Sequence, residues 1–249
     1  MFEVTVSLFI VWYFCYWLAR KLGLSQSFAS ILASATSICG VSAAIAAGGA
    51  VKGDPKEVSH TISLVLLFSM PLLILMPAAA KILGLTGPIA GAWIGGVIDT
   101  TPAVVAAGAL YSDAAMKTAS IIKMSQNIMI AVAAFALSLY WAVRVEKKPE
   151  EKPNLRDIWT RFPKFVLGFM LASVAFTILP TIGITTGSAV GISKELRGWL
   201  FSMAFVSIGI NTNFNDLVKT GGGKPLIVFT AATILDILVS FVSALIFFR

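Results

Sequence analysis

Residues 27–51 read SFASILASATSICGVSAAIAAGGAV, and this stretch decides the fold. Of its 25 residues, 18 are Gly, Ala, Ser, Thr or Cys. Such a segment offers lipid little side-chain surface, so we expect it to lie among other helices. One interpretation is a continuous, tightly packed helix. The other is a discontinuous helix that breaks near residues 37–40, where unpaired backbone groups would face a substrate cavity.

The composition is that of an integral membrane protein. The 249 residues are 57% apolar and 12% charged, whereas soluble domains carry about 25% charged residues. This composition excludes a water-soluble globular protein, a disordered chain and a nucleic-acid-binding protein. The expected partner is therefore the lipid bilayer. Cys15 and Cys39 lie in apolar stretches and are interpreted as packing residues. With His60 as its single histidine, the chain is expected to hold no metal and no cofactor.

Apolar runs of roughly 20 residues, the length needed to cross a bilayer, predict an all-α protein with about eight transmembrane segments. They are 3–19, 27–51, 58–80, 88–110, 118–143, 162–182, 196–217 and 225–248. If every one of these segments crosses the membrane, twelve basic residues lie on the same side of the membrane as Arg20, and six lie on the opposite side. The positive-inside rule then predicts an inner or plasma membrane protein with both termini outside and the basic loop 144–161 in the cytoplasm.

The segment 196–217 is a second candidate for a broken helix. Its apolar stretch gives way at membrane depth to a polar run beside a glycine, which favours a lining for water or a site. The run contains Ser207, Gly209, Asn211, Thr212 and Asn213. The alternative is that the helix ends at Ser207. Each of the two candidate broken helices, 27–51 and 196–217, is followed by a short polar turn and a long span. The two candidate helices would cross the membrane in opposite directions. This pattern predicts an inverted repeat with two broken crossing helices.

The repeat divides the chain into 1–84, a three-span amino-terminal remnant, and 85–249, a five-span unit with the cytoplasmic linker 144–161. Two spans that the second unit has are missing from the first. We therefore expect an amino-terminal partner segment, and a homodimer is the other candidate assembly.

Several ionisable or polar groups fall at membrane depth: Asp99, Thr100, Thr101, Lys123 and Asp236. Charged groups there are costly and are expected to face the bundle or water. They are candidates for sodium or proton coupling or for lining a cavity, and structural hydrogen bonds are the alternative. Lys123 could instead extend to the membrane surface. The spacing of Gly87, Gly91 and Gly95 predicts a helix-packing ridge.

The string Thr36-Ser37-Ile38-Cys39-Gly40, with Val104–Gly108 and Gly223-Lys224-Pro225, resembles the conserved bacterial-type membrane proteins labelled sulfate exporters. The resemblance implies an architecture like that of sodium/bile-acid symporters, with ten helices and an inverted five-helix repeat. It also implies that this chain lacks the amino-terminal spans. Where many members carry a His-acidic pair and then a Gln, this chain has Asp99, Thr100 and Ala103.

These observations favour a non-enzymatic secondary transporter that moves a small anion, such as sulfate or a sulfonate, by alternating access. Helix N-termini at the breaks would bind the anion. The expected substrate-binding residues are Ser37, Cys39, Gly40, Ser42, Ser207, Gly209, Asn211, Thr212 and Asn213. The alternatives are a sodium/proton antiporter or channel of the same fold, or an intramembrane aspartyl protease. The protease is disfavoured because Asp99 lacks the preceding Gly-x-Gly of such enzymes.

Overall fold

The computed structural model describes residues 2–145 and 223–248, together with single positions between 171 and 206. The chain divides into two compact units, Met1–Phe162 with Gly221–Arg249, and Pro163–Thr220. The fold described below is that of the first unit. The predicted spans 162–182 and 196–217 and all but the start of the linker 144–161 lie outside the described ranges.

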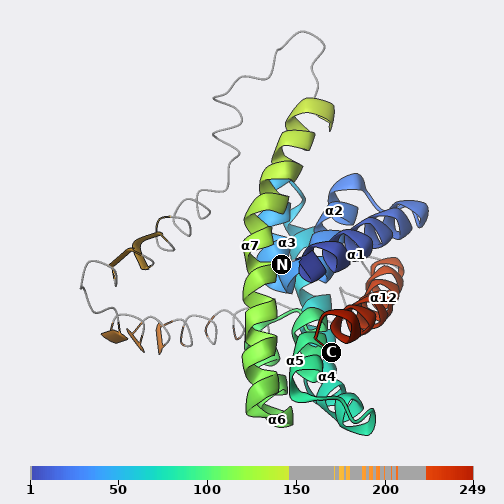
Figure 1. Ribbon diagram of the computed structural model, residues 1–249. Coiled ribbons are helices and arrows are strands. Elements are labelled where there is room, and N and C mark those ends of the chain that lie inside the picture. Colours follow the sequence, from blue (N-terminus) through green and yellow to red (C-terminus); the bar gives the residue numbers. More distant parts are fainter. Residues whose placement is uncertain are drawn as a thin grey trace. The chain divides into compact units, whose positions relative to one another are not determined.

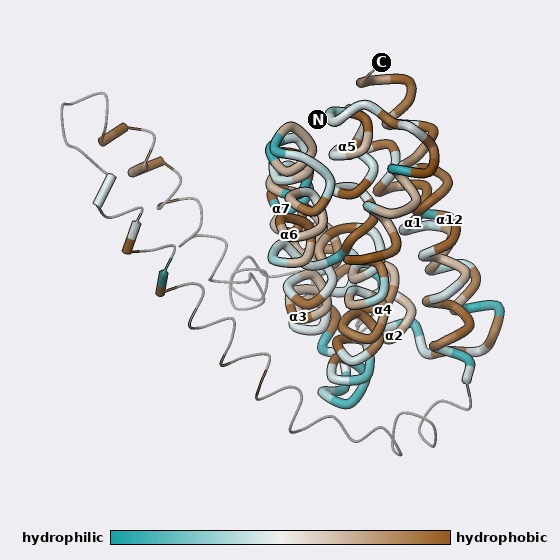
Figure 2. The backbone as a smooth tube through the Cα atoms, turned by 90° about the horizontal axis from the view of Figure 1, so that it is seen from below, coloured by the Kyte–Doolittle hydropathy of each residue, from teal (hydrophilic) through white to brown (hydrophobic). Residues whose placement is uncertain are grey.

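The described ranges are helical, which confirms the predicted all-α class (Figure 1). The elements are α1 (Phe2–Lys21), α2 (Gln26–Ser34), the π-helix η1 (Ala35–Cys39), α3 (Gly40–Ala50), α4 (Pro55–Ile82), α5 (Gly87–Val97), α6 (Thr101–Tyr111), α7 (Asp113–Tyr140), the π-helix η2 (Trp141–Val145) and α12 (Lys224–Phe247). By length and composition alone, four helical segments of the described part of the chain could cross a membrane, namely Gln26–Ala50, Pro55–Ile82, Asp113–Val145 and Lys224–Phe247. Hydrophobic residues dominate these segments in Figure 2.

Residues 26–50 form a helical hairpin, here called hairpin 1. The helix breaks after Cys39, and Gly40 has a φ of +43°. The side chain of Ile31 on α2 lies against Gly48 on α3, so the two arms run antiparallel. Ser25 and Ser27, at the start of α2, both donate hydrogen bonds to Glu57, just beyond the end of α3. Both ends of this hairpin therefore lie at the same end of the helix bundle.

Residues 87–111 form a second hairpin, hairpin 2, in which α5 and α6 are separated by an extended turn at residues 98–100. Gly87 at the start of α5 and Gly108 near the end of α6 both pack on the first turn of α7, at residues 112–116. The Tyr111 hydroxyl donates a hydrogen bond to the Leu85 carbonyl. Both ends of hairpin 2 therefore also lie together.

The long helices α4 and α7 set the distance between the two hairpins. Helix α4 starts beside hairpin 1, where the His60 and Phe28 rings meet edge to face, and it ends at the turn that leads into hairpin 2. Helix α7 returns, so that Tyr140 near its end accepts a hydrogen bond from Gln26. The two hairpins thus enter from opposite ends of the bundle. In Figure 1, α3 lies beside the upper part of α7 and α5 beside the lower part.

Helix starts follow the expected capping chemistry. Ser25, Asp54 and Ser112 each accept a backbone N–H of the first turn of the helix that follows. Proline occupies the first turn of α4, α5, α6 and α12, where its missing N–H costs nothing. The predicted glycine ridge is confirmed, because Gly91 and Gly95 lie directly against the backbone of α7 at Ala115 and Ala119.

The hairpins correct two sequence predictions. The segment 88–110 does not cross as one span, and 27–51 breaks where predicted but turns back. The basic residues are consequently redistributed, because residues on both sides of a hairpin share one end. Arg20, Lys21, Lys52, Lys56 and Arg144 lie at the Tyr140 end of α7, and Lys81 and Lys117 at the Asp113 end. The division at residue 84 stays a prediction.

Candidate functional site

The tips of the two hairpins meet halfway along α7. A Cβ added to Gly40 would lie 3.0 Å from the Cβ of Asp99 and 2.5 Å from Val65 Cγ1 on α4. Only a glycine fits this contact, and the left-handed φ of Gly40 independently favours glycine. The two breaks in the helical backbone are thus held directly against each other.

Lys123 of α7 connects the tips. Its side chain is 1% exposed, and Nζ donates a 3.3 Å hydrogen bond to the carbonyl of Ile38 at the end of η1. This carbonyl belongs to a helix C-terminus, where the peptide dipoles favour a cation. Of the two interpretations of Lys123, the structure supports the buried one, because the ammonium does not extend to the membrane surface.

Two buried carboxylates lie within electrostatic range of Lys123. Asp99 sits in the tip of hairpin 2, and Asp236 projects from α12 and accepts a 3.0 Å hydrogen bond from Ser240. Each carboxylate is 5% exposed. One ammonium against two carboxylates leaves this cluster with a formal charge of −1 when all three groups are ionised. A buried cluster of this kind is stable only with a bound proton, a cation or compensating helix ends.

Compensating helix ends are present in the second arm of each hairpin. Helices α3 and α6 both start at the tips, and in the described structure neither start has a side-chain cap. The Cys39 thiol interacts with the hydroxyl groups of both Ser42 and Thr101, which brings the two helix starts together. Ser42 is exposed and Thr101 half-buried. This pair of hydroxyls therefore forms the accessible face of the site.

The amide side chains of α7 support hairpin 2 from behind. Gln126 donates a 3.1 Å hydrogen bond to the Gly96 carbonyl, and Asn127 lies 3.5 Å from the Thr101 hydroxyl. Within the described part of the chain, the side-chain carbonyl oxygens of both amides have no hydrogen-bond partner. Each of these amides therefore leaves one buried, unpaired acceptor oxygen close to hairpin 2.

Of the predicted residues, the structure brings together Cys39, Gly40 and Ser42 with Asp99, Thr100, Thr101, Lys123 and Asp236. Ser37 is close in sequence, but its hydroxyl donates to the Ala33 carbonyl of its own helix. Ser207, Gly209, Asn211, Thr212 and Asn213 lie outside the described residues. Both cysteines are free and buried, as predicted.

Sequence reasoning missed the turn at 98–100 and the contributions of Gln126 and Val65. The signal for the turn was present, since Thr100 followed two residues later by Pro102 is a typical helix start. No sequence signal distinguishes Val65 from the other apolar residues of α4.

Comparison with known proteins identifies relatives over nearly the whole chain. The family described as Conserved hypothetical protein 698 matches residues 1–229. A UPF0324 membrane protein of Rhodopirellula baltica is 40% identical over 244 residues, which cover 94% of this chain and 45% of the relative. A UPF0324 membrane protein of Nitratidesulfovibrio vulgaris is 40% identical over 233 residues, covering 90% and 40%. One of Nitrosomonas europaea is 32% identical over 252 residues, covering 91% and 51%.

The chain thus spans about half the length, or less, of these relatives. No solved structure matches it.

Proposed function

Because this chain belongs to the membrane-protein family of Conserved hypothetical protein 698, we propose that it forms the solute-binding core of a secondary transporter for a small anion. Sulfate and small sulfonates are the proposed substrates. The observation that carries the proposal is the meeting of two uncapped helix starts, from hairpins that enter from opposite ends, beside the buried ammonium of Lys123.

The electrostatics support an anionic substrate at the helix starts. An α-helix carries roughly half a positive charge at its N-terminus, and free backbone N–H groups there bind anions. The Ser42 and Thr101 hydroxyls add donors at the accessible face. Residues 207–213 remain proposed as further contacts.

The carboxylate side of the cluster supports coupling to a cation. Asp99 and Asp236 would take up a proton or a sodium ion together with the anion, because the bound anion alone leaves the site more negative. Each coupling ion therefore offsets one unit of the negative charge that the anion adds, and a less charged site is less costly to move across a bilayer.

The formal charge of −1 on the cluster of Lys123, Asp99 and Asp236 also favours a second candidate function, a sodium/proton antiporter that carries no anion. The two functions differ in their requirement for the anion. An antiporter would exchange sodium for protons across a membrane in the absence of any transported anion.

Flux measurements test the proposal. The purified chain in proteoliposomes is given labelled sulfate and a panel of small sulfonates, with and without a proton or sodium gradient. We expect saturable uptake of at least one anion that depends on one gradient. The double variant Ser42→Ala/Thr101→Val should weaken this uptake at least tenfold, which corresponds to about 1.4 kcal/mol.

Thr230→Val and Ser125→Ala are matched controls, because these hydroxyls donate to carbonyls of their own exposed helical turns. Both should transport like the wild type. Gradient-driven sodium flux without anion uptake would replace the proposal with the antiporter. The absence of any flux would overturn both.

A further inference from the structure

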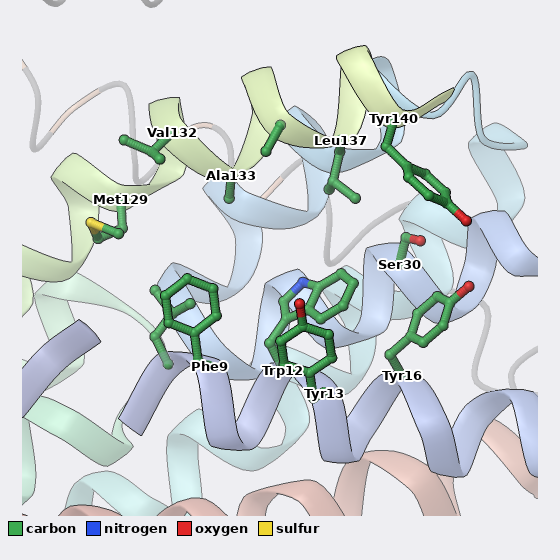
Figure 3. A pocket seen from close by; sticks show the side chains of 12 residues that line it. Phe9, Trp12, Tyr13, Tyr16, Ser30, Met129, Val132, Ala133, Leu137 and Tyr140 are labelled. Atoms are coloured by element: carbon green, nitrogen blue, oxygen red, sulfur yellow. The ribbon is translucent and has the colours of Figure 1, made fainter. Parts of the chain in front are cut away.

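A cavity of about 430 Å³ lies between α1, α2 and α7 (Figure 3). Its lining contains none of the tip residues and none of the ionisable groups described above. Its volume lies in the range of roughly 300–1,000 Å³ typical of small-molecule sites. Several wall residues are exposed, with Phe9 50%, Tyr13 62% and Val132 55% exposed, so the cavity is a groove open to the surroundings of the bundle.

The groove changes in polarity along its length. In Figure 3, Phe9 and Met129 face each other at one end, whereas Tyr16 and Tyr140 stand on opposite walls at the other. The Tyr140 hydroxyl accepts a hydrogen bond from Gln26, the first residue of hairpin 1. The apolar end of the groove thus lies toward the middle of the bundle, and the hydroxyl end lies at the Tyr140 end of α7.

Both walls continue into an exposed arginine. Arg20 follows Tyr16 by four residues on α1, and Arg144 follows Tyr140 by four residues on α7 and η2. On the α-helix α1, residues four apart share one face, and in η2 Arg144 lies about one helical turn beyond Tyr140, so each arginine lies just beyond the tyrosine end of its wall. Beside them, the Lys21 ammonium lies 4.9 Å from the centre of the Trp17 ring, which is an arrangement typical of the membrane interface.

We propose that this groove binds one anionic phospholipid. Its acyl chain would lie between Phe9 and Met129, and its phosphate would lie at the tyrosine end, within reach of Arg20 and Arg144. The charge complementarity favours this occupant. A neutral lipid needs no cation, and a transmembrane helix would not place an anion between two arginines at the membrane surface. Basic clusters at this depth attract anionic headgroups.

Native mass spectrometry of the full-length chain in detergent tests the proposal without any transport measurement. The probes are phosphatidylglycerol and phosphatidylcholine with the same acyl chains. We expect wild-type protein to retain phosphatidylglycerol in preference. Arg20→Gln/Arg144→Gln should lower its occupancy about tenfold, the equivalent of 1.4 kcal/mol, and lower that of phosphatidylcholine less, because the choline of that lipid already offsets the phosphate charge. Both arginines are exposed, but the Arg20 guanidinium also donates a hydrogen bond to the Leu24 carbonyl, so thermal unfolding of the variant is measured alongside lipid binding.

Two further variants complete the test. Lys81→Gln/Lys117→Gln removes two exposed cations from the opposite end of the bundle and should bind like the wild type. Ala136→Trp fills the groove and should reduce the binding of both lipids. The proposal is overturned if the arginine variant keeps its phosphatidylglycerol, if the lysine variant loses as much, or if the filled groove binds like the wild type. None of these outcomes depends on the transport proposal.

Discussion

At the residue scale, Gly40 holds the tightest position of the site. Its φ is positive and the space around its missing Cβ is filled by Val65 and Asp99. Gly40→Ala should therefore lower stability by about 1–3 kcal/mol through overpacking and strain and should separate the two tips. Thermal unfolding in detergent and anion uptake measure the two effects.

Gly84→Ala provides the matched control for this substitution. Gly84 also has a positive φ, +62°, but nothing lies within 4 Å of its missing Cβ. It thus places an alanine at a positive φ without the clash. Equal losses in the two variants would contradict the claim that contact between the tips matters at Gly40.

Lys123 is the second residue that the whole site depends on. Lys123→Met removes the ammonium and leaves two buried carboxylates uncompensated, which should cost about 3–5 kcal/mol of unfolding free energy. Adding Asp99→Asn should restore part of this loss, because one of the uncompensated charges is then absent. Denaturant unfolding of the two single variants and the double variant gives the coupling energy.

Lys117→Met serves as the control, since this lysine lies on the same helix but is exposed. It should unfold like the wild type. If the double variant is less stable than either single variant, the two side chains do not compensate each other's charge.

At the scale of elements, the hairpin topology makes a simple prediction about sidedness. Lys21 and Lys56 flank hairpin 1, and both are exposed. Single cysteines at these positions should react with a membrane-impermeant maleimide from the same side, because the chain between them returns to its starting end. A spanning 27–51 segment would place them on opposite sides. Cysteines at Lys81 and Lys117, which flank hairpin 2, should both react from the other side.

The helical class, the break at Gly40 and the ridge on Gly91 and Gly95 could be predicted from the sequence. The reversal of the chain could not. An apolar segment of 25 residues is long enough to cross a bilayer, but it has the same hydropathy whether it is straight or folded back. Hydropathy shows that the segment prefers the membrane interior and does not show the path of the chain within it. Whether the chain continues or folds back is decided by tertiary contacts such as that between Ile31 and Gly48. These two residues lie on opposite sides of the turn in the sequence, so no local pattern links them.

For the candidate site, the sequence points to individual residues and not to their arrangement. Asp99, Lys123 and Asp236 were identified because an ionisable group at membrane depth is costly wherever it lies. Their convergence with Cys39 depends on two hairpins meeting, and no local pattern encodes that meeting. The polar run at 207–213 lies outside the described structure, so its part in the site stays a prediction.

At the scale of the whole molecule, the redistributed basic residues lead to the same predicted orientation. Arg20, Lys21, Lys52, Lys56 and Arg144 share one end, against Lys81 and Lys117 at the other. By the positive-inside rule we predict that the first end faces the cytoplasm. The maleimide should therefore reach a cysteine at Lys56 in inverted membrane vesicles and not in intact cells. Labelling in intact cells would reverse the orientation.

The backbone contacts of hairpin 2 with α7 limit how this protein can change shape. At Gly91 and Gly95 there is no side chain to act as a spacer, so one helix cannot slide along the other without first lifting away from it. We therefore expect hairpin 2 and α7 to move together as one rigid body. If the proposed transporter opens at its centre, we expect the hinges to lie around hairpin 1.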